Sequence, residues 1–299
     1  MKWEESKKGY ENYLKLEKSL SQNSIAAYIN DINKLDDFLV TKYKGVAPDK
    51  VKLDQLKAFV EWLNEKGVSP RTQARTISGI KSFYKYLLIE GKITNDPTAL
   101  LESPKIGRKL PDILSMEEID TLINAVDLNK AEGQRNKAML ETLYSCGLRV
   151  SELVNLKITN LFFEQGFIKV EGKGEKERLV PASKSAIEEI NKYLNNYRKK
   201  LRVSKDSENI LFLNRRGRKL SRVMIFTIIK NLAEKVGMEK KISPHTFRHS
   251  FATHLINGGA DLRAVQEMLG HESILTTEIY THLDRDYLRN TIHQYHPRS

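Results

Sequence analysis

A break in helical patterning between residues 92 and 114 is the feature that most constrains how this chain can fold. Pro97, Pro104 and Pro111 fall close together there, although the whole chain holds only 8 prolines. Proline lacks an amide hydrogen and disfavours helix at the residue before it, so the segment predicts an extended linker. The 299 residues suffice for two domains with separate cores. We therefore expect domains at 1–91 and 115–299, joined by a linker at 92–114.

The first domain is predicted to be a small bundle of four helices. Apolar residues recur at spacings of three and four over 25–39, 53–63 and 77–88, which is the period of an amphipathic helix. Asn23 is expected to cap the first of these helices, and Ser69 with Pro70 is expected to start the third. A weaker pattern over 5–20 supplies the fourth helix.

The second domain is predicted to be mostly helical with one small β element. Residues 166–171 and 177–180 alternate apolar and polar side chains on either side of a glycine-rich turn, which is typical of a β-hairpin. The apolar run at 209–213 is expected to form a further short strand. The expected fold class is therefore mainly α, with a small β-hairpin or sheet in the second domain.

Composition favours a soluble protein with a polyanionic partner. Lys and Arg total 50 against 38 Asp and Glu, a net charge of +12, although a solubilising surface would also account for the excess. The single cysteine, Cys146, excludes an internal disulfide and a cysteine-based zinc site, and it indicates a reducing compartment. No apolar run approaches the ~18 residues that span a bilayer, and the N-terminus does not resemble a signal peptide. We expect a cytoplasmic protein.

Two arginines lie where helices are expected to begin. Gly147 is expected to end one helix, and Arg149 then stands at the start of the next, where its planar fork and nearby backbone amides can hold a phosphate. The structural alternative is a surface arginine paired with Glu152. In the second motif, Ser243 and Pro244 predict a helix start that places His245 in the first turn and Arg248 on the same face.

Metal binding is a weaker reading of the second motif. His245 and His249 have a spacing that allows two metal ligands on one helix, but the glutamate of an H-E-x-x-H site is absent. The ordinary alternatives are a capping histidine at His245 and a solvated charge at Arg248.

Three further residues complete the candidate set. Lys173 stands in the predicted hairpin turn, His271 follows a helix-ending glycine, and Tyr280 falls in a polar stretch with threonines and a histidine. Taken alone, a lysine there is solvent-exposed and a tyrosine there is a packing residue. The combination and order of the six residues carry more weight than any one of them.

The motifs resemble those of the tyrosine recombinase, or phage integrase, family, and most closely its Xer subfamily. The resemblance rests on Gly147-Leu-Arg-Val-Ser-Glu-Leu153, the run from His245 to His254, Leu269-Gly-His271 and Thr276-Thr-Glu-Ile-Tyr-Thr-His282. It extends over essentially the whole chain, including the N-terminal helices, which it identifies as a DNA-clamp domain. Cys146 and Glu278 depart from the pattern at positions that do not bear on the chemistry.

The resemblance implies a catalytic role for each of the six residues. Tyr280 is the nucleophile that forms a 3′-phosphotyrosyl link, and Arg149 and Arg248 clamp the scissile phosphate. His245 and His271 bind the phosphate or move the proton of the tyrosine, and Lys173 protonates the leaving 5′-oxygen. No metal and no other cofactor is expected, because the covalent link conserves the energy of the broken bond.

The resemblance also implies the partners of the chain. These are double-stranded DNA recombination sites, a homo- or hetero-tetramer with a second Xer-type recombinase, and a cell-division DNA translocase, in a system that resolves chromosome dimers. The alternatives are DNA relaxation of the type IB topoisomerase kind and a non-catalytic architectural protein. The C-terminal segment, with Leu288 and Ile292, either docks on a neighbouring subunit or packs on its own domain. Basic residues expected to contact DNA are Arg71, Arg75, Arg215, Arg216, Arg218, Lys219 and Arg222.

Overall fold

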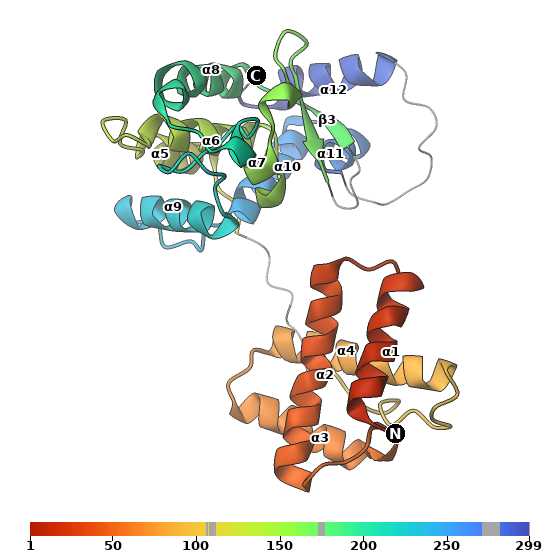
Figure 1. Cartoon of the computed structure of the whole chain (residues 1–299). Helices are drawn as coiled ribbons and strands as arrows, with labels where there is room; N and C mark the ends of the chain where they lie inside the picture. Colours follow the sequence, from red (N-terminus) through yellow and green to blue (C-terminus); the bar gives the residue numbers. More distant parts are fainter. Residues whose placement is uncertain (106, 108–111, 173–176, 271–281, 299) are drawn as a thin grey trace. The chain divides into compact units, whose positions relative to one another are not determined.

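The chain forms two compact units, residues Met1–Lys109 and Leu110–Ser299, each with its own core (Figure 1). The computed structural model describes residues 1–105, 107, 112–172, 177–270 and 282–298, with the backbone alone for 282–286. It is mainly helical and contains one small sheet, so the predicted fold class is confirmed. Within the part of the chain so described, no helix has both the length and the apolar character needed to cross a membrane.

The N-terminal unit is built from four α-helices, as predicted. They are α1 (Trp3–Leu16), α2 (Gln22–Tyr43), α3 (Leu53–Glu65) and α4 (Pro70–Ile89), with a short 3-10 helix at Pro48–Lys50. Helix α4 packs against the other three helices, and its apolar face supplies Ile77, Ile80, Phe83 and Leu87 to the core. Burial of this face stabilises the bundle far more than the helix propensity of its residues.

The helix starts follow local capping chemistry. Ser69 accepts a hydrogen bond from the amide of Thr72, and Pro70 is the first residue of α4, which confirms the predicted start. The predicted cap at Asn23 is wrong, because α2 begins earlier and Ser21 accepts from the amide of Ser24 at 3.3 Å. Both residues are good caps, and the helix simply extends to the more N-terminal one.

The proline-containing segment is partly folded. Leu101 is buried in the N-terminal core, and Leu114 is buried in the C-terminal core, where its amide donates to Ser250 Oγ at 2.9 Å. The boundary between the compact units lies between residues 109 and 110. Both ends of the segment that composition assigns to a linker therefore pack on the units that they join.

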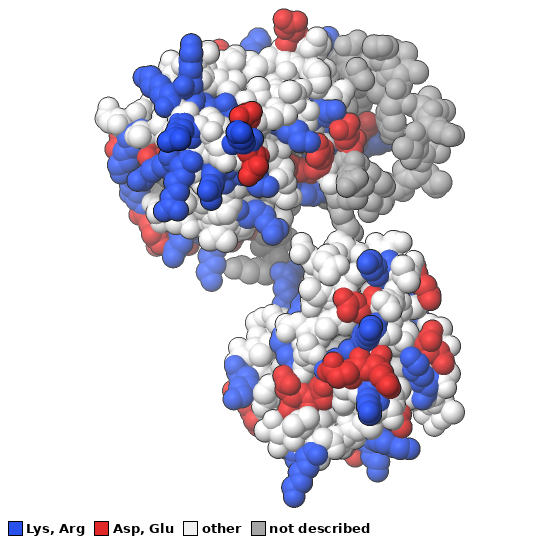
Figure 2. All heavy atoms as spheres, viewed as in Figure 1, with Lys and Arg blue, Asp and Glu red and all other residues white. Residues whose placement is uncertain are grey.

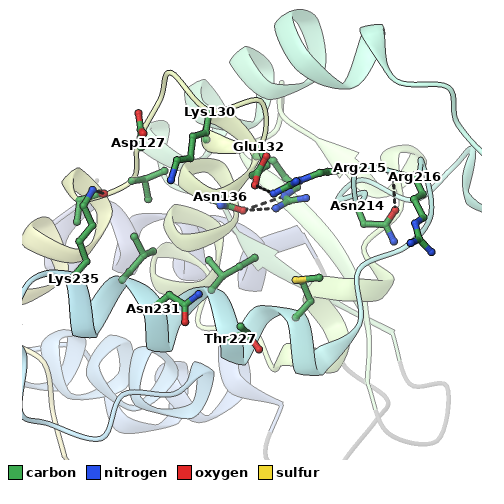
Figure 3. Close-up of a pocket in the computed structure, with 17 residues that line it drawn as sticks. Asp127, Lys130, Glu132, Asn136, Asn214, Arg215, Arg216, Thr227, Asn231 and Lys235 are labelled. Atoms are coloured by element: carbon green, nitrogen blue, oxygen red, sulfur yellow. Dashed lines mark hydrogen bonds and ion pairs between the residues drawn. The ribbon is translucent and has the colours of Figure 1, made fainter.

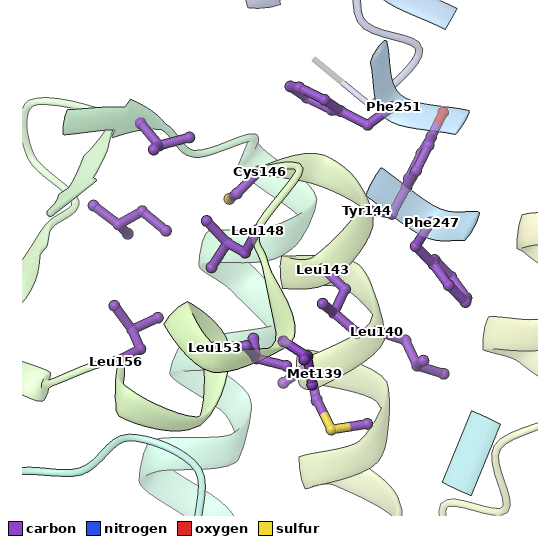
Figure 4. Close-up of a cluster of buried hydrophobic side chains, with 14 of the residues drawn as sticks. Met139, Leu140, Leu143, Tyr144, Cys146, Leu148, Leu153, Leu156, Phe247 and Phe251 are labelled. Carbon is purple, nitrogen blue, oxygen red and sulfur yellow. The ribbon is translucent and has the colours of Figure 1, made fainter. Parts of the chain in front are cut away.

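The C-terminal unit surrounds α6 with other helices. Its helices are α5 (Met116–Asn124), α6 (Gly133–Ser145), α7 (Val150–Asn155), α8 (Lys184–Lys192), α9 (Arg222–Lys235), α10 (Pro244–Gly258), α11 (Leu262–Leu269) and α12 (His282–Tyr295). Figure 4 shows Met139, Leu143 and Tyr144 of α6 among buried side chains that include Phe247 and Phe251 of α10. Because α6 is buried nearly all round, it is the central support on which α7 and α10 are placed.

A three-stranded antiparallel sheet lies beside these helices. Its strands are β1 (Leu161–Phe162), β2 (Phe167–Glu171) and β3 (Glu177–Pro181), in the order β1-β2-β3. The predicted hairpin is β2 and β3, with Phe167 opposite Pro181. The short strand β1 was not expected from the sequence.

The strand predicted at 209–213 is wrong. Only two isolated bridges form there, Lys157 with Ile210 and Leu213 with Lys219. Arg198 donates instead to the carbonyls of Glu208, Ile210 and Leu211 at 2.7–3.2 Å. A guanidinium group thus occupies backbone acceptors that a neighbouring strand would otherwise bind.

Helix α12 packs on its own domain. It contacts α10, α11 and β3, and Leu288 and Ile292 are buried in the core of the C-terminal unit. In the single chain described here α12 therefore packs within its own chain, and docking on a neighbouring subunit stays a prediction.

Candidate functional site

Arg149 stands at the junction that the sequence singled out. Gly147 has a φ of 56°, a left-handed conformation that favours glycine, and Arg149 directly precedes α7. Its guanidinium donates to Glu152 Oε1 at 2.8 Å and to the carbonyl of Gly270 at 2.9 Å. Of the nearby backbone amides that were expected to be open to an anion, the amide of Arg149 itself donates to Glu152 Oε2. The side chain of Arg149 is 32% exposed, so its guanidinium can be reached by an anion, whereas this amide is already engaged.

Arg248 reaches the same place from α10. It donates to the carbonyl of Gly147 at 2.7 Å and to the carbonyl of Leu269 at 2.5 Å. Burial lowers its pKa to about 10, Arg149 acts in the same direction, and Glu152 opposes them. The guanidinium is still cationic at neutral pH, so the structure brings two positive charges together from motifs far apart in the sequence.

His245 lies on the first turn of α10. Ser243 caps the helix by accepting from the amide of Thr246, and Pro244 is the first helical residue, as predicted. The His245 side chain is exposed, and it stands one turn before Arg248 on the same helix. It is available to a ligand that approaches the helix start.

Glu152 neutralises part of this charge. Its carboxylate is 1% exposed and lies 3.9 Å from Arg248, in addition to its bonds with Arg149. Burial acts to raise its pKa, but hydrogen bonds from Arg178 and Arg149 outweigh burial and hold the pKa below its ordinary value. Three guanidinium groups therefore face one carboxylate, which leaves positive charge in excess for an anionic ligand.

The sequence reasoning missed Arg178. This residue of β3 donates to both oxygens of Glu152, at 2.7 and 3.0 Å. In the sequence it is one of two adjacent charged residues, Glu177 and Arg178, at the start of the strand, which is ordinary for the exposed end of a hairpin. An arginine shortly after Lys173, in the returning strand of the same hairpin, is the one signal that the sequence offers.

Three of the six predicted catalytic residues, Lys173, His271 and Tyr280, lie outside the described residues. Their roles stay predictions. The structure brings Arg149 and Arg248 together, and it places His245 at the start of the helix that carries Arg248.

No metal-ligand cluster is found in the described ranges. Across 1–105, 112–172, 177–270 and the described part of α12, no three His, Cys, Asp or Glu side chains gather as metal ligands would. His254, in the same motif as His245 and His249, instead shares a hydrogen bond of 2.8 Å with the hydroxyl of Tyr144.

The DNA-contact candidates of the N-terminal unit lie on α4. Arg71 and Arg75 are both exposed. Arg75 also donates to both oxygens of the buried Asp31, at 2.5 and 2.7 Å. The two bonds fix the orientation of the Arg75 guanidinium toward Asp31, whereas an unpaired surface arginine would be free to rotate.

Two of the five candidates of the C-terminal unit, Arg215 and Arg216, line a cleft of about 820 Å³ between α9 and the start of α6. Figure 3 shows Arg215 and Arg216 at its edge, with Lys130 and Lys235 on other elements, and Arg215 bound to Glu132 at 2.5 Å. The remaining candidates, Arg218, Lys219 and Arg222, are exposed in the same stretch of chain. Lys and Arg side chains also gather densely on the left part of the C-terminal unit in Figure 2.

Comparisons with known proteins identify the family of the chain. Residues 112–286 match the phage integrase family, and residues 8–91 match the phage integrase N-terminal SAM-like domain. Tyrosine recombinase XerD of Chlorobaculum tepidum is 44% identical over 300 residues, covering 99% of this chain and 97% of that protein. Tyrosine recombinase XerD of Listeria innocua is 42% identical over 288 residues, covering 96% and 97%.

A solved structure shares the fold. The XerH site-specific recombinase bound to its difH substrate superposes with a TM-score of 0.66 at 22% identity, over 84% of this chain and 74% of that one. Since two family domains and near-complete relatives above 40% identity cover this chain, it belongs to the phage integrase family and is a site-specific tyrosine recombinase.

Proposed function

We propose that this recombinase uses Tyr280 to attack a phosphodiester of duplex DNA, with Arg149 and Arg248 binding the non-bridging oxygens of the phosphate. The observation that carries the proposal is the convergence of these two arginines on Glu152 and on the end of α11. Two guanidinium groups supply fixed N–H donors and positive charge where negative charge develops in the transition state.

The reaction is a balanced exchange of phosphate esters. The phenolic oxygen of Tyr280 bonds to phosphorus while the bond to the 5′-oxygen breaks, which leaves a 3′-phosphotyrosyl link. His245 or His271 accepts the proton of the tyrosine, and Lys173 gives a proton to the departing 5′-oxygen. A 5′-hydroxyl of a second strand then reverses the attack, so no ATP, metal or other cofactor enters.

The partners follow from the same chemistry. The substrate is a double-stranded recombination site, and the exposed basic residues on α4 and around the cleft grip its backbone. Exchange between two duplexes requires four protomers, in a homo-tetramer or in a hetero-tetramer with a second Xer-type recombinase. A cell-division DNA translocase in the cytoplasm completes the system, which resolves chromosome dimers. The XerD relatives and the DNA-bound XerH structure support this assignment.

The decisive test is covalent capture on a nicked suicide substrate. The full chain is incubated with the nicked duplex, and the DNA-linked peptide is mapped by mass spectrometry. Adduct on Tyr280 is expected, and Tyr280→Phe should bind DNA without forming it. Tyr287→Phe, which changes an exposed tyrosine on α12, is the matched control and should react like the unchanged chain.

Two further arms separate the alternatives. Cleavage should persist in EDTA; loss on chelation that a divalent ion restores would contradict the proposed chemistry. Exchange of flanking arms between two linear sites should occur; supercoil relaxation without such exchange would indicate the topoisomerase alternative. Adduct formation by Tyr280→Phe would reject Tyr280 as the nucleophile.

A further inference from the structure

Arg178 donates from all three nitrogens of its guanidinium group inside the site. Its two terminal nitrogens bind the two oxygens of Glu152 at 2.7 and 3.0 Å, and its Nε donates to the carbonyl of Met268 at 2.9 Å. An arginine that donates from all three nitrogens to fixed acceptors holds its partners rigidly.

Three arginines bind three consecutive carbonyls at the end of α11. Arg178 takes the carbonyl of Met268, Arg248 takes that of Leu269, and Arg149 takes that of Gly270. The last carbonyls of a helix have no partner within it, and cations there also interact favourably with the helix dipole. The end of α11 is thus the common support on which the three guanidinium groups are aligned.

The three arginines divide Glu152 unequally. Arg178 forms a bidentate pair with the carboxylate of Glu152. The guanidinium of Arg149 makes one bond to that carboxylate at 2.8 Å, and the guanidinium of Arg248 lies 3.9 Å from it. A planar guanidinium matches a carboxylate with two parallel bonds, and only one guanidinium can take that position. Because Arg178 takes this bidentate position, neither Arg149 nor Arg248 can form a bidentate pair with Glu152.

We propose that Arg178 is a positioning residue for strand cleavage, which saturates Glu152 so that Arg149 and Arg248 present their free N–H groups to the scissile phosphate. The inference rests on the proposed function of those two arginines. Without Arg178, the guanidinium of Arg149 would form a bidentate pair with the buried carboxylate of Glu152. Glu152 would then compete with the DNA phosphate for the N–H groups of Arg149. Because the exposed basic residues outside the site supply most of the affinity for the DNA backbone, loss of Arg178 should slow cleavage far more than it weakens DNA binding.

The packing around Gly270 agrees with this role. Gly270 has a φ of 63°, and a Cβ added to it would lie 3.1 Å from Cδ and Nε of Arg178. The side chain of Arg178 thus lies directly across the turn whose carbonyl Arg149 binds. A shift of Arg178 is transmitted to that carbonyl by contact.

The test compares Arg178→Gln with the double variant Glu152→Gln/Arg178→Gln in the suicide-substrate assay under single-turnover conditions. Arg178→Gln should slow covalent capture by roughly 10- to 100-fold while the Kd for DNA changes by less than about 2-fold. The double variant should recover a large part of the rate, because it lacks the Glu152 carboxylate that would otherwise form a bidentate pair with Arg149. Arg178→Lys, which keeps the charge but loses the fork, should fall between Arg178→Gln and the unchanged chain.

The matched control is Arg198→Gln, which removes another arginine bound to backbone carbonyls, at 208–211. It should lower the Tm without slowing capture by the folded protein. Arg178→Gln or Arg178→Lys reacting at the unchanged rate would overturn the inference, and so would a double variant as slow as Arg178→Gln. Failure of the unchanged chain to form the Tyr280 adduct would instead refute the proposed function.

Discussion

Each compact unit contains a buried carboxylate that arginine neutralises. Asp31 of α2 is 1% exposed and is bound by Arg75 through both oxygens, with a further bond from Thr76. Glu152 of the C-terminal unit is equally buried and has the same kind of partner in Arg178. A buried charge that loses its partner is strongly destabilising, so these arginines stabilise the fold as well as serving any contact with DNA.

Replacement of Arg75 tests this double role. Arg75→Ala is expected to lower the free energy of unfolding of the N-terminal unit by about 2 kcal/mol, less than a fully buried pair because Arg75 is 48% exposed. Urea denaturation of the full chain measures the change. Arg71→Ala, at an exposed position of the same helix, should stay within ~0.5 kcal/mol of the unchanged chain. Equal stability of the two variants would show that the Asp31 pair contributes nothing.

At the scale of elements, α12 completes the core of the C-terminal unit. It packs on α10 with Leu288 and Ile292, and beyond its end the ring of His296 lies 5.0 Å from that of Tyr144 and 5.3 Å from that of Phe251. Arg298 pairs with Asp120 of α5. The C-terminal segment is therefore an integral part of its own domain in this structure.

Leu288→Ala tests how much this packing contributes. The buried side chain leaves a cavity on truncation, so the free energy of unfolding of the C-terminal unit should fall by about 2–4 kcal/mol. Thermal unfolding measures the loss, with Tyr287→Ala at the neighbouring exposed position as the control. Full stability of Leu288→Ala would mean that the helix does not pack on its own domain in solution.

The pH dependence of stability should report on His296. Burial lowers its pKa to about 3, with His254 and Arg298 acting in the same direction, whereas an unfolded histidine titrates near ~6.5. Between these values the unfolded state binds a proton that the folded state does not. Stability from this group is thus present above pH ~6.5 and is lost as the pH falls, with a slope approaching ~1.4 kcal/mol per pH unit.

His296→Phe should flatten that slope, since phenylalanine keeps the ring contacts and cannot be protonated. Urea denaturation at several pH values from about 7.5 downward measures the difference between the two proteins. Parallel curves over this range would contradict a neutral, buried His296.

At the scale of the whole molecule, the excess of positive charge favours binding to a polyanion such as DNA. The net charge of +12 comes from an excess of Lys and Arg over Asp and Glu. Arg149 and Arg248, proposed here to bind the scissile phosphate, are instead partly buried and lie close to Glu152. Surface charge of this kind acts on the DNA backbone through counterion release, without reading sequence. Affinity for duplex DNA and the rate of cleavage should therefore respond to different residues.

Salt dependence measures the first of these properties. The logarithm of the DNA association constant should fall steeply and linearly with the logarithm of salt concentration, with a slope of about −0.9 for each phosphate neutralised. Arg222→Gln should reduce that slope by about 1, because it removes one exposed cation at the start of α9. A flat dependence would contradict binding through the backbone of a duplex.

Much of the architecture follows from local patterns in the sequence. The 3.6-residue period marks three helices of the N-terminal unit, Ser69-Pro70 and Ser243-Pro244 mark helix starts, and the glycine-rich sequence between β2 and β3 marks the hairpin. These signals are readable because caps, turns and amphipathic faces depend on residues within a few positions of each other. The motifs with Arg149, His245 and Arg248 were visible for the same reason.

Tertiary structure alone decided how those motifs combine. The spacing in the sequence pairs Glu152 with Arg149, but its bidentate partner is Arg178 of β3. In place of the strand expected at 209–213, the carbonyls of that segment accept hydrogen bonds from Arg198. Asp31 with Arg75 and the placement of α12 are contacts of the same kind. Each of these contacts joins residues far apart in the chain. Its contribution to stability depends on burial and on how whole helices and strands pack, and a local sequence pattern carries no information about either.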